Sequence, residues 1–221
     1  MKINLTEIYA GLKAYRHERG LTAQNQKSGY IINIMEEFGE LATALRNYEK
    51  IKNGEQAFKM TTTKIKLADD IFCEVVERKA LCLADAEHEI IDALCDIAVL
   101  TINAGANIPC EYKLDDIDLE KTNYSITTIS SLMAYCATYS SGLECSDIWE
   151  CDYFSDILIE CAKLCEQYGF NFEVAMIETI KEISSRTGSY DEVAKKWVKD
   201  ESDEAKSKWY KADFEKARIV K

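Results

Sequence analysis

The sequence predicts an all-α protein, a bundle of amphipathic helices. Its 221 residues include one proline and nine glycines, so the chain has few breaks and readily forms long helices. Apolar residues make up 47% of the chain, which is enough for a substantial core. In most segments these residues recur every three or four positions, which is the spacing of one helix face.

This spacing predicts a series of helices. They cover residues 5–18, 28–48, 62–80, 85–104, 123–140, 147–168 and 171–186. Gly20 ends the first helix, the stretch KNGEQ ends the second, and Gly105 ends the fourth. Residues 190–221 follow as a Lys-rich amphipathic segment.

We expect these elements to form a single domain over residues 1–221. The acidic, irregular stretch 110–122 is the best internal boundary. Within the domain we expect an inserted helical segment at 51–83, an added helical layer at 106–168 and a basic C-terminal segment at 181–221.

Charge and cysteine usage exclude several classes of protein. The net charge of −12 argues against duplex nucleic acid as a partner, because phosphate binding needs clustered Lys and Arg. The N-terminal stretch mixes charges throughout, unlike a signal peptide, and no apolar run reaches the ~18 residues that span a membrane. Nine cysteines without a CxxC pair indicate small buried side chains in a reducing compartment. We therefore expect a cytoplasmic protein with no membrane contact.

Two acidic clusters stand beside apolar helix faces. On the predicted helix at 28–48, Glu36 and Glu37 lie within about 60° of Glu40, beside Ile34 and Phe38. Such like charges repel and destabilise a helix by a few tenths of a kcal/mol. This arrangement suggests that a cation offsets the charge.

The second cluster lies in the strongly apolar helix at 85–104. Its members Glu89, Asp92 and Asp96 share one face with Asn103, at spacings of three, four and seven residues. Burying unpaired carboxylates costs several kcal/mol. Carboxylates within such an apolar run are therefore poor candidates for an ordinary solvated helix face. If the two helices pack antiparallel, the two clusters converge, and Mg²⁺ with its preference for carboxylate oxygen would neutralise them.

The paired motifs resemble those of the all-α nucleoside triphosphate pyrophosphatases, the MazG-like enzymes. The family signature is EExxE on one helix and ExxD on a later one, here EEFGE at 36–40 and EIID at 89–92. The match extends over residues 24–48 and 85–105. The resemblance implies a MazG-like bundle with a four-helix core, assembled as a homodimer or homotetramer.

The resemblance also implies an activity. Family members hydrolyse a (deoxy)nucleoside triphosphate to the monophosphate and pyrophosphate, with Mg²⁺ as the cofactor and Mn²⁺ as a substitute, and so control nucleotide pools. By position, Glu37, Glu40, Glu89 and Asp92 would bind the metal. Glu36, with Glu37 and Glu40, would form the catalytic group, and Glu36 would activate or orient the water.

Two features depart from the family pattern. The gap between the motifs is longer than in compact members, and His88 precedes Glu89 where many members have a second acid. Both affect the expected substrate and the number of metal ions.

Further residues suit a triphosphate substrate. The C-terminal segment concentrates basic residues, and an Arg near a helix end can bind phosphate through two nitrogens. A Lys-Trp pair offers charge beside a stacking surface. The candidates for substrate binding are Lys27, Asp96, Asn103, Lys181, Arg186, Lys196, Trp197 and Lys199.

Two other functions fit the same sequence. One is an enzyme of the same architecture with a narrower substrate, such as dUTP or phosphoribosyl-ATP. The other is a non-catalytic helical interaction protein whose carboxylates form a structural cation site or a solvated stripe. A di-iron bundle is excluded because neither His17 nor His88 completes a Glu-x-x-His pair.

Overall fold

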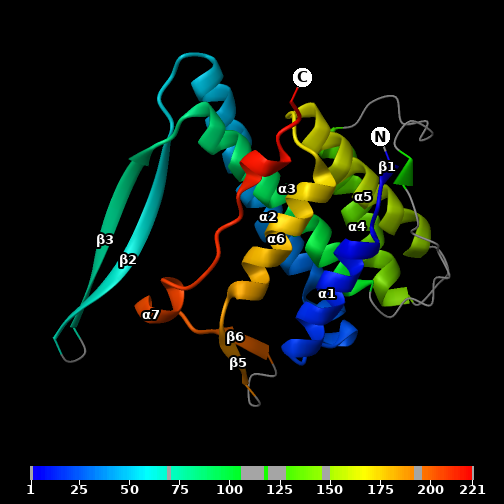
Figure 1. Cartoon of the computed structure of the whole chain (residues 1–221), viewed down its shortest axis with the longest axis horizontal. Coiled ribbons are helices and arrows are strands. Elements are labelled where there is room, and N and C mark those ends of the chain that lie inside the picture. Colours follow the sequence, from blue (N-terminus) through cyan, green and yellow to red (C-terminus); the bar gives the residue numbers. More distant parts are fainter. Residues whose placement is uncertain are drawn as a thin grey trace. The chain divides into compact units, whose positions relative to one another are not determined.

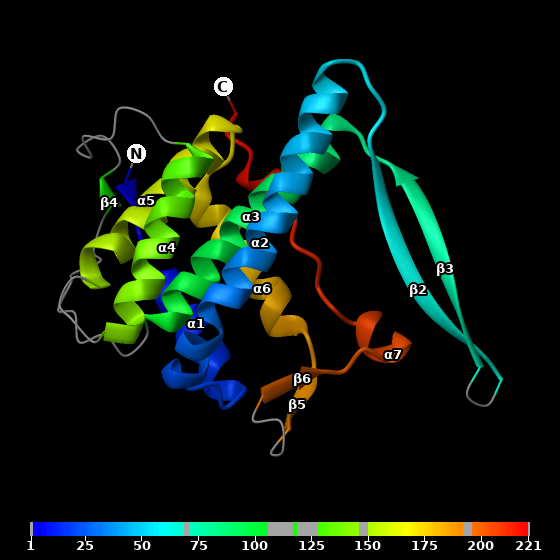
Figure 2. The same cartoon turned by 180° about the vertical axis from the view of Figure 1, so that it is seen from behind.

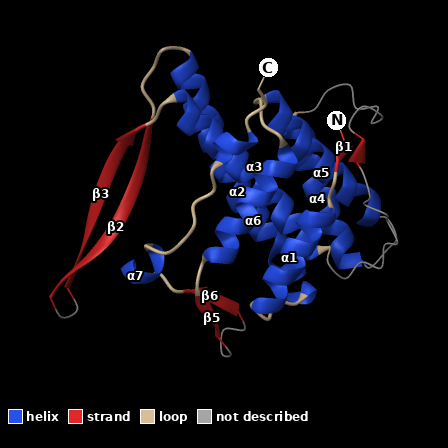
Figure 3. Ribbon diagram, viewed as in Figure 1, coloured by secondary structure: helices blue, strands red, loops and turns tan. Residues whose placement is uncertain are grey.

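The computed structural model describes residues 2–68, 71–105, 117–118, 128–145, 150–191 and 196–220. Within this part the chain is mostly helical, as predicted, and also forms three two-stranded sheets (Figure 1; Figure 3). Where the sequence predicts one domain, the structure separates two compact units. Unit 1 comprises Met1–Phe38 and Ile91–Lys221, and unit 2 comprises Gly39–Ile90.

Three of the four helices predicted in the first half of the chain form largely where the apolar spacing places them. They are α1 (Thr6–Glu18), α2 (Ala23–Lys52) and α3 (Leu83–Ala104). Gly20 follows α1 with φ 61° and Gly54 follows α2 with φ 80°, a left-handed conformation that glycine adopts without strain. The boundary between the units falls within α2 and within α3.

The second half contributes α4 (Ile129–Cys145), α5 (Glu150–Gln167) and α6 (Phe172–Ser185). These helices correspond to those predicted at 123–140, 147–168 and 171–186, while the added layer at 106–168 stays a prediction. Most of residues 106–127 lie outside the described residues. A positive φ at Gly169 allows the turn between α5 and α6, and the side chain of Asn171 caps α6 by accepting the N–H of Val174 at 3.1 Å.

The core of unit 1 lies between these helices. α4 packs on α5, and α6 packs on both α1 and α5 (Figures 1 and 2). Two large aromatic side chains pack at the centre of this core, where Tyr30 meets Tyr139 edge to face with ring centroids 5.3 Å apart. The hydroxyl of Tyr30 lies 3.0 Å from that of Thr101. Four cysteines are buried there as free thiols, as the cysteine pattern predicts: Cys95, Cys136, Cys161 and Cys165.

Unit 2 corrects the helix predicted within 51–83. This segment instead forms an antiparallel hairpin of β2 (Phe58–Ala68) and β3 (Ile71–Ala80), with Phe58 opposite Ala80. The prediction was wrong because it gave weight to widely spaced apolar residues and too little to the β-branched residues. Thr61, Thr62 and Thr63 favour the extended chain, and Val75 and Val76 pair opposite two of them.

The end of the chain is also not the continuous amphipathic segment that its composition suggests. After α6 come a second hairpin, β5 (Gly188–Asp191) with β6 (Lys196–Lys199), the short helix α7 (Asp203–Lys206) and the 3₁₀ turn η1 (Phe214–Ala217). Gly188 permits this hairpin, because a Cβ there would collide with the carbonyl oxygen of Val198 and lie 2.9 Å from the ring of Trp197.

One further pairing was not predicted from the sequence. The strand β1 (Lys2–Ile3) pairs antiparallel with β4 (Ile117–Asp118). Among the described helices, none combines the length and apolar character needed to cross a lipid bilayer.

Candidate functional site

A group of acidic side chains gathers around Asp96 in unit 1. Asp96 on α3 lies in electrostatic contact with Asp92 one turn earlier, with Glu37 on α2 and with Glu182 on α6. Burial, followed by the repulsion of Asp92 and Glu37, raises the pKa of Asp96 well above its ordinary value. Arg186 is the neighbouring cation that acts against this rise. We call Glu37, Asp92 and Asp96 the acidic cluster.

The direction of the helices explains why these residues meet. Tyr30 contacts Thr101, and further along α2 Glu37 approaches Asp96, which precedes Thr101 on α3. Within unit 1 the two helices therefore run antiparallel, as the convergence of the two motifs requires. The structure thus brings together Glu37, Asp92 and Asp96 of the predicted site.

Other predicted members lie elsewhere. Glu36 belongs to unit 1, and its side chain is exposed. Glu40 and Glu89 belong to unit 2, where Glu40 is exposed and Glu89 forms an ion pair with Lys59 at 2.8 Å. Their assignment as metal ligands stays a prediction.

The acidic cluster is not a closed metal cage. Within the described part of the chain, no group of three or more His, Cys, Asp or Glu side chains could hold a metal ion. The cluster is instead an open collection of carboxylates, two of them on successive turns of α3 and one on α2.

Arg186 borders the acidic cluster from the end of α6. Its Nη2 donates to Glu182 Oε1 at 2.7 Å, and its guanidinium carbon lies 6.0 Å from the ring centre of Trp209. The side chain is partly exposed and its charge acts on Asp96. The anionic group that Arg186 meets is Glu182, and its predicted contact with substrate phosphate stays a prediction.

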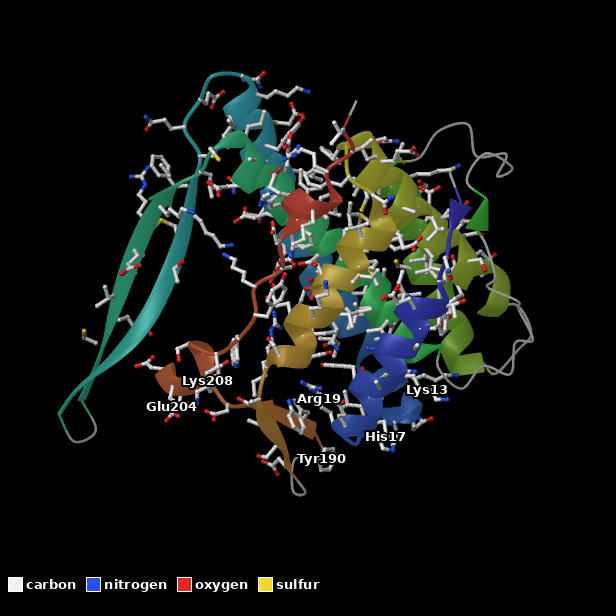
Figure 4. The ribbon with its side chains drawn as sticks, viewed as in Figure 1. Lys13, His17, Arg19, Tyr190, Glu204 and Lys208 are labelled. Carbon is white, nitrogen blue, oxygen red and sulfur yellow. The ribbon has the colours of Figure 1, made fainter. Side chains whose placement is uncertain are left out.

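Arg19, which the sequence reasoning did not single out, holds the end of α6 in place. Its side chain is buried, and Nη2 donates to the carbonyl oxygens of Ile183, Ser184 and Arg186 at 2.8 to 3.1 Å. These carbonyls lack partners within α6, so the guanidinium caps its C-terminal end. Figure 4 shows Arg19 between the end of α1 and the last turn of α6.

Two aromatic rings enclose Arg19. Its guanidinium carbon lies 4.4 Å from the ring centre of Tyr15 and 5.2 Å from that of Trp197. Burial is the main cause that raises the pKa of Tyr15, and the charges of Arg186 and Asp96 also act on this pKa. Trp197, predicted to stack on a base, therefore packs against Arg19 within the protein.

The remaining predicted substrate residues are scattered. Asn103 is buried and its Oδ1 accepts from Arg16 Nη1 at 2.6 Å, so this side chain fixes an arginine of α1. Lys181 pairs with Glu178 at 2.7 Å. Lys199 is exposed on β6 and Lys27 is partly buried on α2, while the side chain of Lys196 lies outside the description.

Replacing Asp96 by asparagine is expected to stabilise the protein in EDTA at about pH 7. The raised pKa means that charging Asp96 opposes folding, so this penalty grows as the pH rises through the unfolded and then the folded pKa. Removing the charge should raise the free energy of unfolding by about 1–2 kcal/mol and the melting temperature by about 2–8 °C.

The control for this experiment is Glu7→Gln, which alters an exposed carboxylate on α1 and should leave the melting temperature unchanged. Near pH 3, where both forms of residue 96 are neutral, the gain of Asp96→Asn should disappear. A variant less stable than the wild type at neutral pH would contradict the described charge environment.

Comparisons with models of protein families, with curated proteins and with solved structures find no match to this chain.

Proposed function

We propose that this chain is a Mg²⁺-dependent nucleotide pyrophosphohydrolase of the MazG-like type. It would hydrolyse a (deoxy)nucleoside triphosphate to the monophosphate and pyrophosphate. The observation that supports this proposal is the crowding of Glu37 and Asp92 around the half-buried Asp96, with Arg186 at its border. A strongly perturbed carboxyl group among specific charged partners is typical of functional sites.

The crowding argues against a solvated acidic stripe. Exposed carboxylates keep nearly ordinary pKa values because water screens their repulsion. Asp96 behaves differently, since burial and repulsion both oppose its charged form. A group of this kind favours a cation that binds between the carboxylates.

The open arrangement suits Mg²⁺ better than a tightly caged metal. Mg²⁺ is usually held by one or two carboxylates, and waters and substrate phosphates complete its coordination. Glu37 and Asp92 would offer such carboxylates beside Asp96. When bound, the metal supplies positive charge to the phosphates at which negative charge develops.

The protein's own residues would then bind and orient the substrate. Arg186 would contact phosphate oxygens through its planar guanidinium, whose position Arg19 supports through the carbonyl oxygen of residue 186. Glu36 would orient the attacking water and accept its proton, a role that its exposed carboxylate permits. Cleavage between the α and β phosphates would release pyrophosphate.

The biological role would be the control of a nucleotide pool by a homodimer or homotetramer. A narrower specificity, for dUTP or phosphoribosyl-ATP, is compatible with the same cluster.

Product analysis tests the proposal. Purified protein is incubated with each of the four dNTPs, the four NTPs and dUTP, in Mg²⁺ and in EDTA, and the products are separated by chromatography. Glu37→Gln serves as the site variant and Glu7→Gln as the matched surface control. We expect monophosphate and pyrophosphate with the wild type and the control, and neither product in EDTA or with Glu37→Gln.

The other outcomes also discriminate. If the products are diphosphate and phosphate, the proposed metal site stands, but the bond hydrolysed is the one between the β and γ phosphates. No turnover of any nucleotide by well-folded protein would overturn the proposal and favour the interaction protein.

A further inference from the structure

The segment Trp209–Lys216, which we call the C-terminal strap, is bound along one face of α6. In Figure 1 it follows α7 and leads to η1 alongside this helix. Three α6 side chains, spaced three and four residues apart and therefore on one stripe, accept main-chain N–H groups of the strap. The hydrogen bonds are Tyr210 N to Ser185 Oγ (2.8 Å), Ala212 N to Glu182 Oε2 (2.7 Å) and Asp213 N to Glu178 Oε2 (3.2 Å).

Glu182 is the point where the strap meets the candidate site. Its Oε2 accepts from the strap at Ala212, while its Oε1 accepts from Arg186 Nη2, each at 2.7 Å. Both oxygens are thereby fixed, so the carboxylate has little freedom to rotate. The strap also approaches Arg186 directly, because the ring of Trp209 lies 6.0 Å from its guanidinium carbon.

Glu182 and Arg186 also neighbour the acidic cluster. Both Glu182 and Arg186 act on the charge of Asp96, and all of these residues belong to unit 1. A chain of contacts therefore runs from the strap through one carboxylate to the arginine beside the acidic cluster.

We propose that Glu182 is a positioning residue, which couples the seating of the C-terminal strap to the orientation of Arg186. This inference rests on the proposed function in one respect, the binding of phosphate by Arg186. The coupling itself depends only on the contacts of Glu182. One main-chain donor of the strap, the N–H of Ala212, binds Glu182, so removing this group breaks the coupling.

Ala212→Pro removes the N–H that Glu182 accepts and leaves both members of the ion pair in place. The matched control is Lys216→Met, which weakens the strap on the same face of α6 at Glu178 but retains the bond to Glu182. Two quantities are measured in full-length protein. They are the ¹⁵N–¹H signal of Arg186 Nε with its hydrogen exchange rate, and KM and kcat for the dNTP hydrolysed fastest.

We expect Ala212→Pro to shift the Arg186 signal and to accelerate its exchange, while Lys216→Met leaves both unchanged. KM should rise about tenfold with kcat within about twofold, because a charge-assisted contact to substrate is weakened. In an Arg186→Ala background, Ala212→Pro should raise KM no further.

An unchanged Arg186 signal in a folded Ala212→Pro protein whose strap amides have lost protection would overturn the inference. If that variant does not fold, the test is made on the wild type in increasing urea, where the hydrogen exchange of Arg186 Nε should accelerate together with that of the Ala212 amide. Independent exchange of the two groups would overturn the inference. A shifted signal together with a wild type that hydrolyses no nucleotide would support the coupling and overturn the proposed function.

Discussion

Asp92→Asn is expected to lower kcat/KM for the preferred nucleotide by about 100-fold or more, the usual cost of losing a central charged group in an active site. Asp92 lies one turn from Asp96 on the same face of α3, where the amide would keep the shape but lose the charge. The loss should appear mainly as weaker binding of Mg²⁺. Titrating Mg²⁺ at saturating nucleotide measures it, and the half-saturating concentration should rise.

The matched control for Asp92→Asn is Asp203→Asn, which changes an exposed aspartate at the start of α7. This variant should retain wild-type kinetics. Equal activity of Asp92→Asn and the wild type at limiting Mg²⁺ would show that the acidic cluster does not bind the catalytic metal.

Glu178→Gln is expected to lower the free energy of unfolding by about 2–4 kcal/mol at neutral pH, because it removes one charge from a buried network. The residue Glu178 is 1% exposed. It accepts hydrogen bonds from the side chains of Lys181, Tyr210 and Lys216 and from the main-chain N–H of Asp213. Urea denaturation measures the change.

Acid should remove the same contribution in the wild type. Burial acts to raise the pKa of Glu178, but the hydrogen bonds outweigh it and lower the pKa to about 2. Because the folded pKa lies below the unfolded value of about 4.3, the stabilisation is complete above that value and is lost as the pH falls towards 2. Glu178→Gln should lack this component of the acid dependence.

The control for Glu178 is Glu204→Gln. Glu204 also pairs with a lysine, Lys208, at 2.7 Å, but both side chains are exposed (Figure 4). Exposed pairs contribute little, so the urea midpoint should not change. Similar losses in the two variants would show that burial of Glu178 does not strengthen its contacts.

The helices could be predicted from the sequence because their apolar residues repeat with the helical period over long stretches. In α3 the apolar residues between Ile90 and Ile102 are buried on several sides. The hairpin of β2 and β3 could not be recognised in the same way. Its pairing is a contact between two segments, whereas the periodic signal is read within one.

The candidate site was predictable to the extent that it depends on spacing along α2 and α3. The motif around Glu37 and Asp92 identified the helices, and their antiparallel run in unit 1 brings these two residues to Asp96. Glu182 was missed, although its position four residues before Arg186 is a standard ion-pair spacing. Nothing local in the sequence indicates that Arg19 binds the last carbonyls of α6, because that contact joins segments over 160 residues apart.

The dependence of α6 on the strap has a consequence for the nascent chain. The strap follows α6 in the sequence, so the ribosome makes this helix before the strap donors for Glu178 and Glu182 exist. Until then Glu178 has Lys181 as a partner and Glu182 has Arg186, but the oxygens that the strap binds need water, and this face of α6 stays hydrated. A nascent chain that stops after β6 would therefore contain Arg186 while the Glu182 carboxylate lacks its contact to the strap. The arrangement of these two side chains would form only after the strap has been synthesised.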